Sequence, residues 1–183
     1  LLCGCGKREA SAVSELPAAA GNGLRLTQSE AVNSTAYEKE AAYADFLAAA
    51  KPAFLIPGLE EGCVPQGMGL CAAKGRLYIS NYFTADGMPS VITALDAQSG
   101  TLKAEYFLYQ PGGAAFDSHV GGVAVSDTTL YVSAKLDNDG GYSIAAIPLE
   151  SLAESGSQNV SVETIIQLPV SPSFLNYSDG VLW

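Results

Sequence analysis

The chain has 183 residues, 48% of them apolar, and its 19 acidic and 9 basic side chains give a net charge of −10. This apolar content excludes a disordered acidic tail and is sufficient for a folded domain. The negative charge argues against a nucleic-acid partner and against electrostatic binding to a membrane surface, because both require basic patches. The sequence also lacks the run of about 18 apolar residues that a transmembrane helix needs.

The first residues have the character of the end of a secretory signal. Leu2-Cys3-Gly4-Cys5 resembles the bacterial lipobox, whose last Cys becomes the lipid-modified N-terminus. We therefore interpret residues 1–5 as a signal-peptide remnant and Cys5 as the lipid attachment site. The protein would be exported and held at the extracytoplasmic face of the cell membrane by its lipid anchor. The alternative is an ordinary cysteine-rich N-terminus, although the spacing of Cys3 and Cys5 does not fit a zinc site.

Two segments precede the β-rich part of the chain. Residues 6–33 are rich in Ala, Ser, Glu and Gly without periodicity, which predicts a flexible tether. Residues 34–61 are predicted to form a helix and a lead-in, with a capping box at Thr35 and Glu38 and a stop at Pro52. We expect its apolar stripe to pack on the domain itself, the alternative being a partner-binding helix. The stripe consists of Tyr43, Phe46, Leu47 and Ala50.

From residue 62 onwards the chain repeats itself. Leu77-Tyr78-Ile79-Ser80 recurs as Leu130-Tyr131-Val132-Ser133, 53 positions later, and Leu182-Trp183 follows at a similar offset. Each copy is preceded by a turn, and before that turn lies a short apolar strand, the third of these at Ser173–Tyr177.

Each repeat has room for four strands. A four-stranded antiparallel unit of about 50 residues has the size of a β-propeller blade. We therefore predict an all-β fold in which residues 62–183 form a partial β-propeller of two blades and part of a third. An eight-stranded barrel or a sandwich would not predict the repeat. Because a ring needs more blades, we expect the sequence to be an N-terminal fragment of a longer chain. The expected strands are 66–72, 75–81, 90–96, 101–108, 121–126, 129–135, 142–148 and 161–168.

The first repeat carries a family resemblance. It contains Val64-Pro65-Gln66-Gly67-Met68, then Leu77-Tyr78-Ile79-Ser80, then Leu95-Asp96 leading to Gly100-Thr101-Leu102. This pattern resembles bacterial secreted propellers with a Pro-Gln-Gly segment at the start of a blade. It is similar in part to glutaminyl cyclotransferase-type propellers, which have a Gln-Gly-Leu opening strand. The resemblance implies the fold class. It does not imply the cyclotransferase activity, because no residue of this sequence can be assigned as the catalytic acid.

The candidate binding residues follow from the repeat. In a propeller the first strand of each blade lines the central channel, and ligands often bind at the channel mouth. Gln66, His119 and Ser173 occupy comparable strand starts in three successive repeats, so we expect them side by side. Asn81 is a further candidate for ligand hydrogen bonding. His119 is the only histidine, and its alternative role is to lock the blade junction through backbone carbonyls.

Other motifs favour structural roles. Asp137-Asn138-Asp139-Gly140-Gly141 lacks the last ligand of a calcium loop and is interpreted as a hairpin turn. Cys63 and Cys71 are expected to be buried free thiols, with a bridge as the alternative. The aromatic residues of the first repeat are expected to pack between blades. We expect no metal and no cofactor.

The sequence favours a non-catalytic function. We expect the channel mouth to bind a small molecule, a glycan or a peptide, with the membrane reached through the lipid anchor only. The alternatives are a propeller enzyme of hydrolase, lyase or cyclotransferase type that uses the same channel, and a protein-interaction scaffold. For the enzyme, Asp117 is the only acid near His119.

Overall fold

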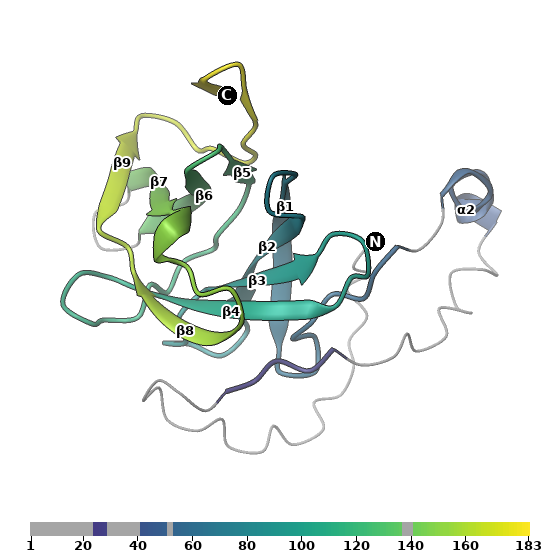
Figure 1. The fold of residues 1–183 in the computed structure, drawn as a ribbon, viewed down its shortest axis with the longest axis horizontal. Coiled ribbons are helices and arrows are strands. Elements are labelled where there is room, and N and C mark those ends of the chain that lie inside the picture. The colour runs from purple at the N-terminus through teal and green to yellow at the C-terminus, as the bar shows by residue number, and fades with distance from the viewer. Residues whose placement is uncertain (1–23, 29–40, 51–52, 137–140) are drawn as a thin grey trace.

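The computed structural model describes residues 24–28, 41–50, 53–136 and 141–183 (Figure 1). Within these ranges the chain is mostly β-stranded, with open sheets of five, four and two strands and one short α-helix. The all-β class is therefore confirmed, and in this part of the chain the sheets form no closed ring.

The first sheet contains the first repeat. Its strands β1 (Cys63–Cys71), β2 (Arg76–Phe83), β3 (Val91–Asp96) and β4 (Leu102–Tyr109) pair antiparallel in chain order. The β3–β4 turn is built by Asp96, whose carboxylate accepts the backbone N–H groups of Gln98 (3.1 Å) and Ser99 (2.9 Å). Gly100 ends the turn with φ +71°, a conformation that favours glycine. All four strands were expected from the sequence, with ends shifted by up to three residues.

The second sheet contains most of the second repeat. Its strands β5 (Val123–Val125), β6 (Thr129–Leu136), β7 (Gly141–Pro148) and β9 (Thr164–Leu168) also pair antiparallel. The strand expected at 121–126 is shorter at both ends. Residues 137–140 of the expected hairpin turn lie outside the described residues.

One strand crosses between the sheets. The sequence predicted a single strand over 161–168, but the structure has β8 (Gly156–Ser161) in addition to β9. After the 3₁₀ turn η2 (Leu149–Ser151), β8 leaves the second repeat and pairs parallel with β4, from Ala104↔Gly156 to Tyr109↔Ser161. This pairing satisfies the outer edge of β4, which the first repeat alone would leave open. The sequence analysis predicted neither this strand nor the edge that it joins.

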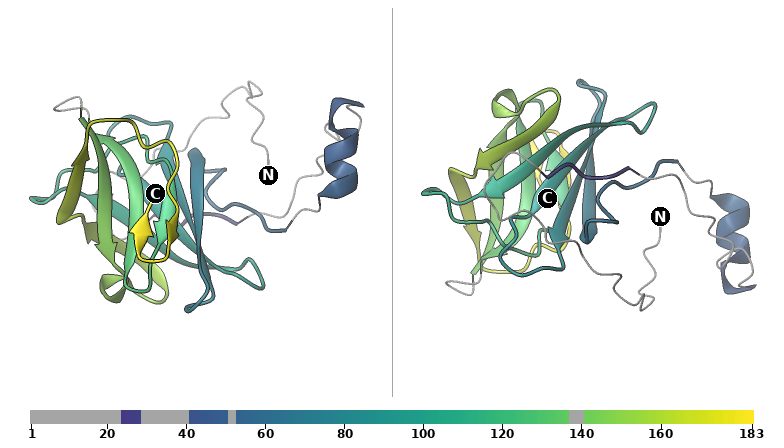
Figure 2. Two further views of the ribbon diagram at one scale, coloured as in Figure 1. Left: turned by 90° about the horizontal axis from the view of Figure 1, so that it is seen from above. Right: turned by 90° about the horizontal axis from the view of Figure 1, so that it is seen from below.

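The core lies mainly between the two large sheets (Figures 1 and 2). Its largest fully buried side chains come from both repeats and the connection between them: Ile92, Leu108, Phe116, Leu130 and Ile147. A smaller cluster covers the start of β1 and contains Leu26, Cys63, Phe83, Val91 and Phe107. The aromatic residues of the first repeat were expected to pack between blades, but two pairs pack within the first sheet: the ring centroids are 6.5 Å apart in both Tyr78–Tyr106 and Phe83–Phe107.

The third sheet is a small hairpin of β10 (Tyr177–Ser178) and β11 (Val181–Leu182). Its turn places Asp179 (φ 53°) and Gly180 (φ 81°) in the left-handed region, as the Asp-Gly pair predicts. The strand expected at 173–177 is wrong except at Tyr177, whose ring stacks on Tyr131 at 6.1 Å. Before this hairpin, Phe174 and Leu175 lie against Gly122 of the second repeat.

The helical segment stands apart from the sheets. It consists of the 3₁₀ turn η1 (Ala41–Tyr43) and α2 (Ala44–Ala49), and both views of Figure 2 place α2 away from the sheets. Phe46 is 48% exposed, so the expectation that this helix packs on its own domain is wrong for the described residues. Thr35 and Glu38, the expected capping box, lie outside those residues. Within the described ranges, no helix has the length and apolar character needed to cross a bilayer.

Candidate functional site: the glycine junction

The starts of the three repeats meet through glycines. A Cβ added to Gly67 of β1 would lie 2.5 Å from the Gly121 carbonyl oxygen and 3.0 Å from the Gly122 Cα. A Cβ on Gly122 would in turn collide with the backbone of Phe174 and Leu175. Such close approach of two backbones requires residues without side chains. We call Gly67, Gly121 and Gly122 the glycine junction, because they place the starts of successive repeats directly against one another.

A buried serine hydroxyl connects the first two repeats at this junction. The Ser80 Oγ accepts the Gly67 N–H (3.0 Å) and donates to the Gly121 carbonyl oxygen (2.6 Å). In the second repeat, Ser133 exchanges two 2.9 Å backbone hydrogen bonds with Gly121 and Gly122. The serine that ends each Leu-Tyr-x-Ser copy is therefore part of the junction. Its role was missed from the sequence, although its recurrence at the same place was the available signal.

His119 lies two residues before the junction and is exposed. Its imidazole stacks on the half-buried ring of Tyr82, with centroids 4.1 Å apart and planes tilted by 35°. Tyr82 belongs to β2 and is paired with Val64 of β1, so this contact links the second repeat to the first. The sequence favoured packing between repeats for the aromatic cluster that includes Tyr82, but strand periodicity did not show that His119 would be the residue in contact with its ring.

Gln66 and Ser173 are exposed and adjoin the same junction. Gln66 occupies the irregularity in β1 pairing between Pro65 and Gly67, and its amide donates only locally, to the Pro65 carbonyl (3.0 Å). The Ser173 carbonyl oxygen would lie 3.6 Å from a Cβ on Gly121. Gln66, His119 and Ser173 thus sit within two residues of the backbone contacts that join the repeats. We call these three residues and Tyr82 the junction surface.

Asn81 and Asp117 are engaged elsewhere. Asn81 is fully buried, and its amide donates to the carbonyl oxygens of Ile79 (3.0 Å) and Val91 (3.4 Å). Its Oδ1 has no hydrogen-bond partner in the structure, yet burial keeps it off the junction surface. The Asp117 carboxylate accepts the Gly87 N–H (2.9 Å) and so holds a neighbouring loop.

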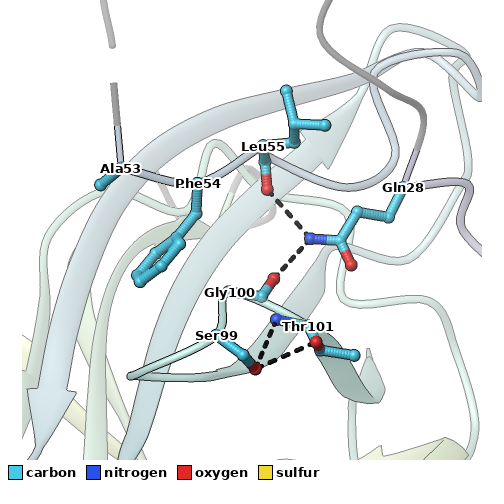
Figure 3. Close-up of a pocket in the computed structure, with 7 residues that line it drawn as sticks. All are labelled: Gln28, Ala53, Phe54, Leu55, Ser99, Gly100 and Thr101. Carbon is cyan, nitrogen blue, oxygen red and sulfur yellow. Dashed lines mark hydrogen bonds between the residues drawn. The ribbon is translucent and has the colours of Figure 1, made fainter. Parts of the chain in front are cut away.

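The described residues contain no metal cluster, and a shallow hollow among them lies away from the junction surface. Across 24–28, 41–50, 53–136 and 141–183, no three His, Cys, Asp or Glu side chains gather closely enough to hold a metal ion. A shallow hollow of about 340 Å³ lies beside the β3–β4 turn (Figure 3). None of the junction-surface residues lines it. The lining residues are Gln28, Ala53, Phe54, Leu55, Ser99, Gly100 and Thr101.

Comparisons with protein-family models, with curated proteins and with solved structures found no match to this chain.

Proposed function

We propose that the chain belongs to an extracytoplasmic, lipid-anchored protein whose β-propeller binds a small molecule, a glycan or a peptide at the junction surface. The two large sheets would be blades, and the β10–β11 hairpin would belong to a third. Three features support this architecture: each large sheet contains a four-stranded antiparallel series in chain order, β6 starts 53 residues after β2, and β1 lies against the start of the next repeat. In a propeller, consecutive blades pack in this way around a central axis.

The observation that carries the binding proposal is that three exposed polar residues adjoin the glycine junction in sequence. Gln66, His119 and Ser173 come from three repeats, and their backbones are brought together by contacts that tolerate no side chain. Amide, imidazole and hydroxyl groups can each donate and accept hydrogen bonds, and the Tyr82 ring beneath His119 adds an apolar surface. Uncharged polar groups beside an aromatic ring suit the recognition of neutral polar ligands.

The single histidine makes a direct test available. The imidazole protons of His119 give a unique NMR signal in protein freed of any tag, since the chain has only one histidine. The protein would be titrated separately with chitotriose, maltotriose and trialanine, one probe for each of two glycan types and one for peptides. We expect one probe to shift the His119 signal with saturation at millimolar concentration or below, which corresponds to about 4 kcal/mol of binding free energy or more.

Variants locate the binding. Gln66→Ala should weaken binding of the probe that saturates, whereas Gln98→Ala, which removes another exposed glutamine in the β3–β4 turn, should leave the affinity unchanged. An unmoved His119 signal with all three probes at about 10 mM would contradict the proposed ligand classes. Equal effects of Gln66→Ala and Gln98→Ala would contradict the proposed location.

A further inference from the structure

Residues 24–28 lie against the first sheet although the sequence assigns them to a flexible tether. The Leu26 N–H donates to the Glu105 carboxylate (2.7 Å) and the adjacent Thr27 N–H donates to the Glu61 carboxylate (2.7 Å). The Thr27 hydroxyl also donates to Glu61, and the Thr27 carbonyl accepts the Gly58 N–H (2.9 Å). Two successive backbone N–H groups are therefore each bound by the carboxylate of a different residue. Hydrogen bonds to carboxylates are stronger than those between neutral groups.

Gln28 extends this attachment to the β3–β4 turn (Figure 3). Its Oε1 accepts the Leu102 N–H (2.8 Å), and its Nε2 donates to the carbonyl oxygens of Gly100 (2.5 Å) and Leu55 (3.3 Å). One side chain thus joins the start of β4 to the segment that leads into β1. This glutamine satisfies backbone groups much as a neighbouring strand would.

Leu26 supplies the apolar part of the attachment. It is 5% exposed and packs in the smaller core cluster with Cys63, Phe83, Val91 and Phe107. Cys63 is free and also only 5% exposed. Burial, followed by the charges of Glu61 and Glu105, raises the pKa of the Cys63 thiol to about 12. The thiol lies in a site that Leu26 helps to close.

Glu105 connects the same segment to the second repeat. It lies on β4, is 4% exposed, and its second carboxylate oxygen accepts the Ser157 hydroxyl of β8. A buried carboxylate is costly unless hydrogen bonds satisfy it. Residues 24–28 and β8 therefore each donate to one oxygen of the same buried carboxylate.

We propose that residues 24–28 form a clasp, a segment that docks as a unit on the first sheet and fixes the N-terminal part of the chain to the domain. The clasp goes beyond the proposed binding function. Only its consequence for the membrane depends on the proposed lipid anchor. With the clasp docked, residues 6–23 alone separate Cys5 from the domain, and they can span at most about 65 Å. Without it, the linker would extend to residue 52 and could span more than about 150 Å.

The two buried thiols allow the clasp to be tested within one molecule. Cys63 lies under the clasp, whereas Cys71 belongs to the main core cluster between the sheets. Iodoacetamide labelling of each thiol would be resolved by fragment-ion mass spectrometry. We expect Leu26→Ala and Gln28→Ala to raise the labelling rate of Cys63 about tenfold or more while that of Cys71 stays constant, because only local opening is made easier. Arg25→Ala, which removes an exposed side chain of the clasp, is the matched control and should change neither rate.

Hydrogen exchange of the unmodified chain provides a second measurement. We expect the Leu26 and Thr27 amides to exchange at least about a hundredfold more slowly than an unprotected chain. Exchange at the unprotected rate would overturn the clasp. So would wild-type Cys63 labelling in both variants, or an equal rise at Cys71, because the segment would then not open as a separate unit. Neither measurement uses a ligand or a lipid, so each result stands apart from the outcome of the binding titrations.

Discussion

Replacing Gly67 by Ala tests the backbone contact on which the glycine junction depends. The added methyl group would meet the Gly121 carbonyl oxygen at 2.5 Å and the Gly122 Cα at 3.0 Å. Both are backbone atoms, so relief requires β1 to move away from the second repeat. Overpacking of this kind costs about 1–3 kcal/mol. Alanine recovers about 0.5–1 kcal/mol through the lower entropy of the unfolded chain, leaving a net loss of up to about 2.5 kcal/mol, and of about 1.3 kcal/mol at the middle of both ranges.

This loss is large enough to measure by thermal unfolding. For roughly 130 residues in the sheets and connections, the unfolding entropy near 60 °C is about 0.27 kcal/mol/K, so the middle value of the net loss should lower Tm by about 5 °C. Differential scanning calorimetry would measure the change. Gly141→Ala is the matched control, since a Cβ on that strand glycine meets only the end of the Gln167 side chain, at 3.0 Å. A Tm for Gly67→Ala equal to that of Gly141→Ala, or above that of the wild type, would refute the close contact between the repeats.

Three further predictions concern single side chains. Hydrogen bonds from the Ser99 N–H and hydroxyl and from the Gln98 N–H lower the pKa of Asp96. Its stabilising effect is therefore present above the unfolded pKa of about 3.9 and lost as the pH falls through the lower folded value. Asp96→Asn should accordingly reduce Tm more at pH 7 than at pH 2.5, and an equal reduction at both would contradict this. Because the pKa of Cys63 is raised to about 12, its contribution is present below about pH 9 and lost towards pH 12. The free energy of unfolding, measured by urea denaturation, should therefore decrease less between about pH 9 and about pH 12 in Cys63→Ala than in the wild type. An equal decrease in both proteins would count against burial of the thiol. Growth with a radiolabelled fatty acid should label the full chain but not Cys5→Ser, and labelling of both would rule out Cys5 as the lipid site.

Much of the secondary structure could be predicted because it depends on local pattern. The strands of the first repeat follow from apolar runs bounded by turn residues, and the Asp96–Gly100 turn follows from its Asp, Ser and Gly. The Asp179-Gly180 turn was predicted for the same reason. The strand expected over 173–177 failed because Phe174 and Leu175 pack against the backbone of Gly122, and ladder hydrogen bonds begin only at Asn176, which pairs with Trp183.

The candidate site was predictable only in part. The repeat indicated that Gln66, His119 and Ser173 occupy comparable places, and the structure puts each beside the glycine junction. The repeat could not show that Asn81 is buried. Alternation in a strand predicts that only one of residues 80 and 81 is buried, but both faces of β2 are covered at this point. The stacking of His119 on Tyr82 also depends on a contact between two repeats, which no local pattern encodes.

The sequence by itself determined the strand-rich character of the chain, its repeat of about 50 residues and most of its turns, because these depend on neighbouring residues. Only the tertiary structure decided that β8 would join the edge of β4, that Leu26 would be buried over Cys63, and that α2 would stand away from the sheets. The physical reason is that an open strand edge or an apolar face is stabilised when any suitable segment covers it, and the local sequence does not determine which distant segment does so. That choice depends on shape and donor position, such as the N–H groups of residues 26 and 27 reaching two carboxylates at once.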